Sequence, residues 1–253
     1  MLETLLKKID ALQNEIRALR PLDQQEAREL RNYFKIGLTY SSNALEGNTL
    51  TETETKVVLE DGLTVGGKPL IYHLEAIGHA RAYDYMYELA TKKTITEADI
   101  CSLHRLFYAG INKEEAGVYR TRQVYITGTT FVPPVPSLVG KHMHAFADSI
   151  PVLQKTLHPV IYAATLHKEL VTIHPFVDGN GRTARLVMNL ALLQSGYVVT
   201  IIPPIYRLQY IDTLKQSQCS GNDRPFFELI ASAVYESQKD YMRLLGKDHN
   251  TPT

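Results

Sequence analysis

The chain has 253 residues, of which 44% are apolar and 21% charged, and its 27 basic side chains balance its 27 acidic ones. This length and composition are typical of an ordinary globular protein with one large domain, or a core with a small annex. The lack of a basic excess argues against a nucleic-acid partner, and no apolar run approaches the ~20 residues that a membrane span needs.

Helical periodicity dominates the first hundred residues. Residues 1–20 have an amphipathic pattern that predicts a helix packed on the domain, with a dimer contact as the alternative. Asp23, Thr51 and Thr96 are suitable N-cap residues at the start of three later patterns. The expected helices cover residues 1–20, 23–46, 51–60, 70–89 and 96–108.

The helical pattern stops at residues 117–134, GVYRTRQVYITGTTFVPP. This segment is rich in Val, Tyr, Ile and Thr and ends at two prolines, which predicts two short strands around Gly128-Thr129. Helices are expected again from near residue 137 and over 158–173, 182–195, 206–219 and 225–246. The fold class that follows is all-α with one β-hairpin.

The most informative stretch is His174-Pro-Phe-Val-Asp-Gly-Asn-Gly-Arg-Thr-Ala-Arg185. A glycine-rich turn that opens a helix presents unpaired N–H groups at the positive end of the helix dipole, which makes an anion site. Asp178 can bind a divalent cation, and the guanidinium groups of Arg182 and Arg185 can hold phosphate. His174 can serve as a proton acceptor near neutral pH. The stretch therefore predicts a nucleotide-phosphate site.

This stretch resembles, without a mismatch, the HPFxDGNGRxxR signature of the Fic family, and the resemblance covers roughly residues 25–245. It implies a mainly helical fold with a β-hairpin flap next to the active site. It also implies transfer of AMP from ATP to a Tyr, Ser or Thr hydroxyl of a target protein. The expected parts are N-terminal helices 1–60, a core 61–247 with the flap at 117–134 and the active loop at 174–185, and a tail 248–253.

The resemblance assigns roles within the active loop. His174 is the expected base, and Asp178 is the expected ligand of Mg²⁺, with Mn²⁺ as the alternative metal. Arg182 is assigned to the β-phosphate and Arg185 to the γ-phosphate. The expected phosphate-binding residues together are Gly179, Asn180, Gly181, Arg182 and Arg185.

Gly181 distinguishes between activities inside the family. Doc-type relatives, which phosphorylate their targets, carry Lys at this position, whereas glycine leaves room for phosphate. The resemblance therefore favours AMP transfer. A variant that transfers phosphocholine shares the motif and stays open as an alternative.

Residues 42–47, Ser-Asn-Ala-Leu-Glu-Gly, resemble the inhibitory motif [S/T]xxxE[G/N] of the same family. Ser42 and Glu46 are one helical turn apart and can face the same cleft. A Glu46 carboxylate on Arg185 would take that guanidinium from the γ-phosphate and misalign ATP. We therefore expect autoinhibition, with self-AMPylation once Glu46 is released. Two other readings stay open: Glu46 helps to remove AMP from proteins, or the protein is a catalytically silent nucleotide-binding module.

Other site residues follow from the same resemblance. Val124, Tyr125, Ile126 and Thr127 in the hairpin match the flap that binds a target segment by β-augmentation. Arg120, which follows Gly117-Val-Tyr119, fits the family pattern GxxR. Tyr210, on the helix expected near residue 206, is a candidate for the adenine side. The six histidines other than those at 158, 174 and 248 are interpreted as surface or hydrogen-bonded residues: His73, His79, His104, His142, His144 and His167.

The expected compartment is the cytoplasm. The two cysteines, Cys101 and Cys219, lie far apart and form no metal-binding pair, and the first residues lack the apolar core of a signal peptide. The chain ends soon after its last expected helix, so we do not expect the DNA-binding tail of longer Fic chains. ATP and a target protein are the expected partners, with a homodimer as a further option.

Overall fold

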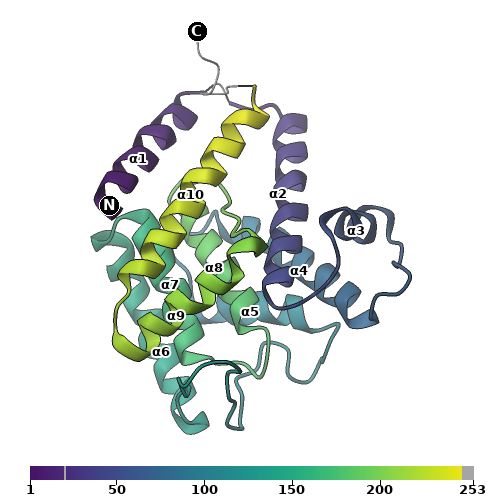
Figure 1. Ribbon diagram of the computed structural model, residues 1–253, viewed down its shortest axis with the longest axis vertical. Helices are drawn as coiled ribbons and strands as arrows, with labels where there is room; N and C mark the ends of the chain where they lie inside the picture. The colour runs from purple at the N-terminus through teal and green to yellow at the C-terminus, as the bar shows by residue number, and fades with distance from the viewer. Residues whose placement is uncertain (20, 247–253) are drawn as a thin grey trace.

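The computed structural model describes residues 1–19 and 21–246 (Figure 1). Every regular element within them is helical, which confirms the expected mainly helical class. In chain order these are α1 (Leu2–Ala18), α2 (Gln24–Leu45), α3 (Glu52–Lys56), the π-helical η1 (Val57–Asp61), α4 (Leu70–Leu89), α5 (Glu97–Tyr108), α6 (Pro136–Thr156), α7 (Pro159–Ile173), α8 (Asn180–Gln194), the 3₁₀ turn η2 (Pro204–Tyr206), α9 (Arg207–Ser220) and α10 (Arg224–Leu244).

Side-chain caps explain where three of these helices begin. Asp23, Thr51 and Thr96 each accept a hydrogen bond from the backbone N–H three residues on. The acidic side chain at that third position accepts a bond from the N–H of the cap residue in return. Each capping box satisfies two donors that the helix itself leaves unpaired. The expected starts of α2, α3 and α5 are therefore confirmed.

Helix α8 lies at the centre of the molecule, in contact with α4, α5 and α7 (Figure 1). All residues from 182 to 192 are buried. A helix that is covered on every side must be largely apolar all round, which the sequence from 186 to 193 satisfies. This packing fixes the position of the N-terminal turn of α8, which ends the active loop.

The N-terminal helices pack on the rest of the domain. α1 lies beside α10, with Ile9 fully buried between them, so the expected packing on the domain is confirmed (Figure 1). α2 packs against α4 across the expected division near residue 60. The C-terminal end of α2 reaches α8, which brings Ser42 and Glu46 to the active loop.

The β-hairpin expected at 117–134 is not formed: neither this segment nor any other described residue is in a strand. Two prolines at its end lack the N–H that a strand ladder needs. Instead, side chains from the first half of the segment donate to the backbone carbonyls of these two prolines. Arg120 Nη2 donates to the Pro134 carbonyl at 2.5 Å, and Gln123 Nε2 donates to that of Pro133 at 3.0 Å. The flap segment, residues 117–134, is therefore a loop whose two arms are joined by side chains.

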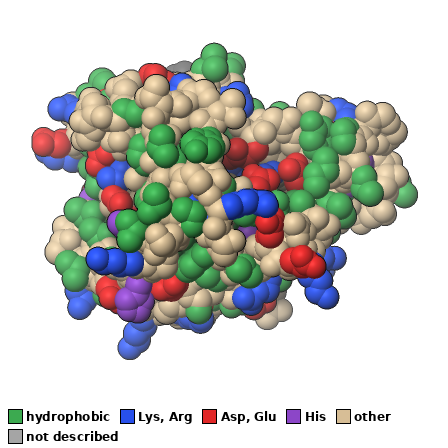
Figure 2. Space-filling model, turned by 90° about the horizontal axis from the view of Figure 1, so that it is seen from below, with side chains coloured by type: hydrophobic (Ala, Val, Ile, Leu, Met, Phe, Trp, Pro, Cys, Tyr) green, Lys and Arg blue, Asp and Glu red, His purple; other side chains and the backbone are tan. Residues whose placement is uncertain are grey.

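The surface gives two further findings. In the view of Figure 2, acidic and basic side chains are interspersed, and neither sign forms an extended patch on that face. Within the residues that the structure describes, no helix is long and apolar enough to cross a bilayer. The expected tail at 248–253 lies outside the described residues.

Candidate active site

His174 follows the last turn of α7 in a left-handed conformation, with φ of 51°. Its ring Nδ1 lies 3.2 Å from the carbonyl oxygen of Val171. Because a carbonyl can only accept, Nδ1 carries the hydrogen and Nε2 keeps its lone pair. Burial first, and then the charge of Arg120, lower the pKa of His174. The ring is therefore neutral at neutral pH and can accept a proton at Nε2.

The active loop is closed on itself by Asn180. Its side-chain oxygen accepts the N–H of Phe176 at 2.9 Å, and its Nδ2 donates to the carbonyl of the same residue at 2.9 Å. Phe176 is fully buried and stacks on His104, with ring centroids 3.7 Å apart. The Asn180 side chain is thus used by the loop itself, and its backbone N–H is the donor that it can offer to an anion.

Helix α8 begins at Asn180, two residues earlier than the sequence pattern predicts. The N–H groups of its first three residues have no partner within the helix. Gly179, which precedes them, has φ of 75°, and a Cβ there would lie 2.6 Å from Cε1 of Phe107. Only glycine fits this position. The turn therefore leaves three N–H groups without helix partners at the positive end of a buried helix, an arrangement that commonly binds an anion.

Asp178 presents an open carboxylate beside this turn. Its side chain is 58% exposed, its Oδ2 lies 3.4 Å from Arg182 Nη2, and its Oδ1 accepts the N–H of Gly179 at 2.7 Å. No group of three or more metal-binding side chains occurs among the described residues. A cation here would need further oxygen ligands from phosphate or water, which is how Mg²⁺ usually binds. The residues present fit a Mg²⁺-nucleotide.

Arg182 is held by a partner that the sequence does not reveal. Its Nη1 donates to Glu75 Oε1 at 2.6 Å, and the guanidinium carbon lies 4.6 Å from the centre of the Phe107 ring. The other oxygen of Glu75 accepts Asn48 Nδ2 at 2.8 Å. The side chain of Arg182 is only 4% exposed. One carboxylate of α4 therefore links the active loop to the segment that follows Glu46.

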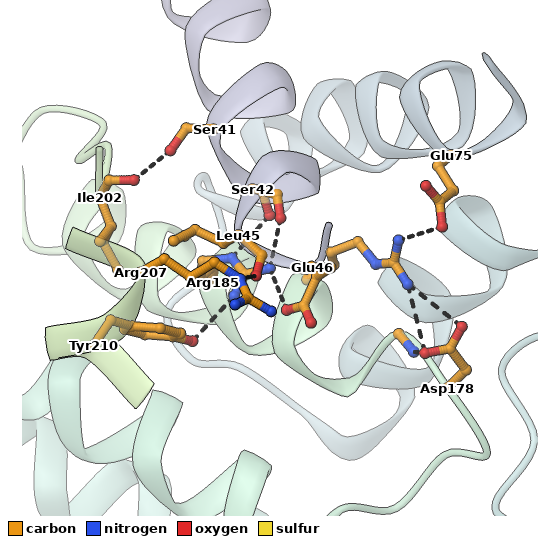
Figure 3. Close-up of polar contacts among 12 residues, drawn as sticks. Ser41, Ser42, Leu45, Glu46, Glu75, Asp178, Arg185, Ile202, Arg207 and Tyr210 are labelled. Atoms are coloured by element: carbon orange, nitrogen blue, oxygen red, sulfur yellow. Dashed lines mark hydrogen bonds and ion pairs between the residues drawn. The ribbon is translucent and has the colours of Figure 1, made fainter. Parts of the chain in front are cut away.

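Arg185 is surrounded by polar groups from α2 and α9 (Figure 3). Nε donates to Ser42 Oγ at 2.9 Å and Nη2 to the Ser42 carbonyl at 2.8 Å. Nη2 also donates to Glu46 Oε1 at 2.7 Å, and Nη1 donates to the Tyr210 hydroxyl at 3.0 Å. Ser42 and Glu46 thus meet Arg185 from the same face of α2, as their spacing predicts.

The Glu46 carboxylate also lies directly in front of α8. A Cβ added at Gly181 would overlap Glu46 Oε1 and come within 3.2 Å of Arg185 Nη1. Burial opposes the charge on Glu46, but the positive charges of Arg185 and then Arg182 lower its pKa overall. An ionised carboxylate therefore lies next to the N-terminal turn of α8.

Tyr210 lies behind Arg185. It is 5% exposed, and its hydroxyl is 2.9 Å from His167 Nε2 as well as 3.0 Å from Arg185 Nη1. In this arrangement its polar group orients the arginine. A place for Tyr210 on the adenine side stays a prediction.

His104 joins two parts of the site, which the sequence alone does not indicate. Its Nδ1 accepts the N–H of Gly117 at 2.8 Å, and its Nε2 donates to the Asp178 carbonyl at 3.0 Å. Burial lowers the pKa of His104 to about 4, so the ring is neutral and can make both bonds. The interpretation of His104 as a hydrogen-bonded histidine is confirmed, and the bonds connect the start of the flap segment to the active loop.

Comparisons with known proteins agree with this geometry. The Fic/DOC family model matches residues 94–192. The protein adenylyltransferase Fic of Drosophila willistoni is 40% identical over 205 residues, which are 80% of this chain and 41% of that protein. A structure of Fic-1 (residues 134–508) from C. elegans has a TM-score of 0.87 at 31% identity, over 97% of this chain and 73% of that one. A Fic domain-containing signalling protein from Bacteroides thetaiotaomicron has a TM-score of 0.84 at 27% identity and covers 100% of this chain and 99% of its own.

The chain spans about two fifths of the length of the Drosophila relatives that it matches. The likeness to the C. elegans structure extends well beyond the segment matched by the family model and takes in almost the whole chain. The chain therefore belongs to the Fic/DOC family.

Proposed function

We propose that the protein is an autoinhibited protein adenylyltransferase, which transfers AMP from Mg²⁺-ATP to a Tyr, Ser or Thr hydroxyl of a target protein. The observation that carries the proposal is that one loop presents both a neutral histidine and the open N-terminus of a buried helix. The names of the relatives, protein adenylyltransferase, support the same reaction.

In the proposed reaction the target hydroxyl oxygen attacks the α-phosphorus of ATP, and the bond from that phosphorus to the pyrophosphate oxygen breaks. The hydroxyl proton passes to Nε2 of His174, the nitrogen that keeps its lone pair. Negative charge grows on the α-phosphate oxygens. The backbone N–H groups of Asn180 and Gly181 would stabilise that charge.

Asp178 is the proposed ligand of the Mg²⁺ that accompanies ATP, with Mn²⁺ as the alternative metal. Its carboxylate is largely exposed and lies beside the phosphate-binding turn. A divalent ion bound there would neutralise phosphate charge and orient the α- and β-phosphates.

Arg182 and Arg185 are the proposed ligands of the β- and γ-phosphates. Each already pairs with a carboxylate, at 2.6 Å for Arg182 and 2.7 Å for Arg185. Gly181 has no side chain in front of the helix, where a phosphate would lie. For this reason we favour AMP transfer over the phosphate transfer of relatives with Lys at this position.

Glu46 is the proposed brake, because its carboxylate lies where we place phosphate, against Gly181 and on Arg185. Its volume and its negative charge both disfavour a nucleotide phosphate at that point. ATP bound beside it would have a misaligned α-phosphate, and a misplacement of ~1 Å can cost ~100-fold in rate. Withdrawal of Glu46 would release the activity, including self-AMPylation.

The target peptide is proposed to lie along residues 124–127 of the flap segment. Tyr125 and Thr127 are exposed there, whereas Val124 and Ile126 are half-buried. No strand ladder uses the backbone of this stretch, so an extended peptide can pair with it.

The proposal is tested by labelling with α-³²P-ATP. Glu46→Gly removes the carboxylate from the anion site, so we expect self-labelling to rise by about 100-fold over the unmodified protein. His174→Ala in the Glu46→Gly background should abolish labelling while nucleotide binding, measured by calorimetry, persists. Equal labelling with and without Glu46 would refute the proposal that Glu46 inhibits the enzyme. Labelling that persists in the His174→Ala variant would refute the proposal that His174 is the base.

Mass spectrometry of the labelled protein decides which group is transferred. AMP transfer adds an adenylate, whereas a Doc-like reaction adds phosphate alone and a phosphocholine transferase would need a different donor. A silent nucleotide-binding module would bind ATP in both variants and add nothing.

A second candidate function is removal of AMP from modified proteins. It is favoured by the position of Glu46, whose side chain is 36% exposed and lies next to the phosphate-binding turn. A carboxylate there could take a proton from water that attacks the AMP–protein bond. Self-AMPylated Glu46→Gly protein, mixed with unlabelled wild-type protein, provides the assay: release of labelled AMP supports this activity, and stable label argues against it.

A further inference from the structure

Arg120 is the most unusual charged residue outside the proposed phosphate site. It is 3% exposed, and no carboxylate in the described part of the chain forms an ion pair with it. A buried charge without a partner of opposite sign is costly unless hydrogen bonds compensate for lost water. The bonds that compensate for it should therefore show what the residue does.

All of these bonds go to backbone carbonyl groups. Nε donates to the His174 carbonyl at 2.8 Å, Nη1 to that of Arg122 at 3.2 Å, and Nη2 to that of Pro134 at 2.5 Å. The backbone N–H of Arg120 donates to the Pro175 carbonyl at 2.9 Å. One side chain thus joins the start and the end of the flap segment to the residue proposed as the base.

The conformation of His174 gives a second, independent observation. Among the described residues it is the only non-glycine residue with positive φ. A left-handed non-glycine residue is strained and persists only where its surroundings hold it. The bond from Arg120 fixes the carbonyl group of His174. The N–H of His174 is fixed in turn, because it donates to the Leu170 carbonyl at 2.9 Å. Arg120 therefore helps to hold the backbone of His174 in this left-handed conformation.

We propose that Arg120 is a positioning residue that holds His174 and the target-binding flap segment together as one unit. This inference rests on the proposed function, because it assumes that His174 is the base and that the flap segment receives the target. On this proposal, the guanidinium of Arg120 aligns His174 with the target hydroxyl that the flap segment holds. A lysine cannot replace it, since an ammonium group does not offer donors in a fork that reaches three separate carbonyls.

The test compares Arg120→Lys and Arg120→Met in the Glu46→Gly background, with Arg224→Met as the matched control. Arg224 lies on α10, outside the proposed site and the flap segment, and its side chain is 66% exposed and pairs with Glu228 at 3.1 Å. We expect both Arg120 variants to self-label about 100-fold more slowly, by misalignment, while their affinity for Mg²⁺-ATP changes less than about 3-fold. The control should label at the parent rate.

Two readouts separate positioning from support of the fold. In ¹⁵N spectra of the histidine rings, with the His174 signals identified by their loss in His174→Ala, the parent should show the Nδ1–H tautomer alone. Both Arg120 variants should show mixed tautomers or broadened signals for His174. A purely structural role would lower the melting temperature and leave the tautomer unchanged.

The pH profile distinguishes the charge of Arg120 from its geometry. The charged groups facing His174 are Arg120, Glu46 and Asp178, and Arg120 lowers the pKa of the ring while the two carboxylates raise it. With Glu46 replaced throughout, Arg120→Met should raise that pKa and move the acid limb of the labelling rate to higher pH. Arg120→Lys keeps the charge, so its acid limb should stay in place although its rate falls.

The outcomes are separable. If Glu46→Gly protein with intact Arg120 gives no labelling, the proposed function fails, and the ring spectra still decide whether Arg120 positions His174. If Arg120→Lys labels at the parent rate with an unchanged tautomer, the proposal is overturned. If both variants lose cooperative melting and ATP binding, Arg120 is needed to fold the domain and the positioning proposal is equally overturned.

Discussion

At the scale of single residues, the position of Glu46 explains both its ionisation and its proposed effect. The carboxylate belongs to the end of α2 but lies at the N-terminus of α8, where the helix dipole favours negative charge. Burial works against the charge, but Arg185 and Arg182 outweigh it and lower the pKa of Glu46. The residue is therefore ionised at neutral pH and resembles, in charge and place, the phosphate that it would exclude.

Glu46→Gln should make the stability of the protein less dependent on acid pH. A carboxyl whose pKa in the folded state lies below the ordinary 4.5 stabilises the fold above that value and loses this contribution as the pH falls through the folded-state pKa. We therefore expect the wild type to have the higher melting temperature at pH 7 and the difference to shrink below about pH 4.5. Thermal melts of both proteins between pH 3 and 7 provide the measurement. A difference that is constant over this range would contradict the assigned pKa shift.

At the scale of elements, the turn into α8 depends on the contact between two helices. Gly179 has a left-handed backbone, and the ring of Phe107 from α5 lies where a side chain at position 179 would begin. The ring of His104, one turn earlier on α5, stacks on Phe176. α5 therefore shapes the loop that presents the N–H groups of α8, although it provides none of the residues expected to contact ATP.

Gly179→Ala should destabilise the protein more than Gly221→Ala does. Both glycines have φ near 70°, at 75° and 70°, so both variants carry the strain of a left-handed alanine, about 1–2 kcal/mol. A Cβ at 221 meets nothing within 4 Å, whereas a Cβ at 179 would lie 2.6 Å from Phe107. Overpacking adds about 1–3 kcal/mol at 179. Urea unfolding measures both losses, and equal losses would show that Phe107 moves aside freely.

At the scale of the whole molecule, the first and the last helix close the domain together. α1 packs along α10, and Gln238 Nε2 donates to both the Ile9 carbonyl, at 3.2 Å, and Gln13 Oε1, at 2.9 Å. The site itself combines the active loop between α7 and α8 with residues of α2, α4, α5 and α9, which lie at distant positions in the sequence. The stability of the site therefore depends on the folding of the domain as one unit.

Ile9→Ala should lower the free energy of unfolding by about 2–5 kcal/mol, because the side chain is fully buried between α1 and α10. The loss should be the same at every protein concentration, since the contact lies within one chain. Unfolding curves recorded over a hundredfold range of concentration provide the measurement. A loss that depends on concentration would instead support the dimer contact considered from the sequence.

The features predicted correctly are those with local causes. The capping boxes at Asp23, Thr51 and Thr96 involve residues three positions apart, and the pairing of Ser42 and Glu46 on one face of α2 follows from a single helical turn. The expected hairpin failed because strand pairing is decided by competition for backbone groups. Here the side chains of Arg120 and Gln123 bond to the carbonyls of Pro134 and Pro133, and the periodicity of the sequence does not indicate such bonds.

The sequence by itself determined most of the helices, the caps of three of them and the resemblance of one loop to the Fic signature, because each of these follows from residues that are close along the chain. Only the tertiary structure decided which distant residues bond to that loop. Glu75 meets Arg182 across 107 positions, His104 meets Asp178 across 74, and Arg120 meets the His174 carbonyl across 54. Such pairs form because packed helices bring distant groups together, and buried polar groups then bond to whatever acceptor the packing has placed beside them.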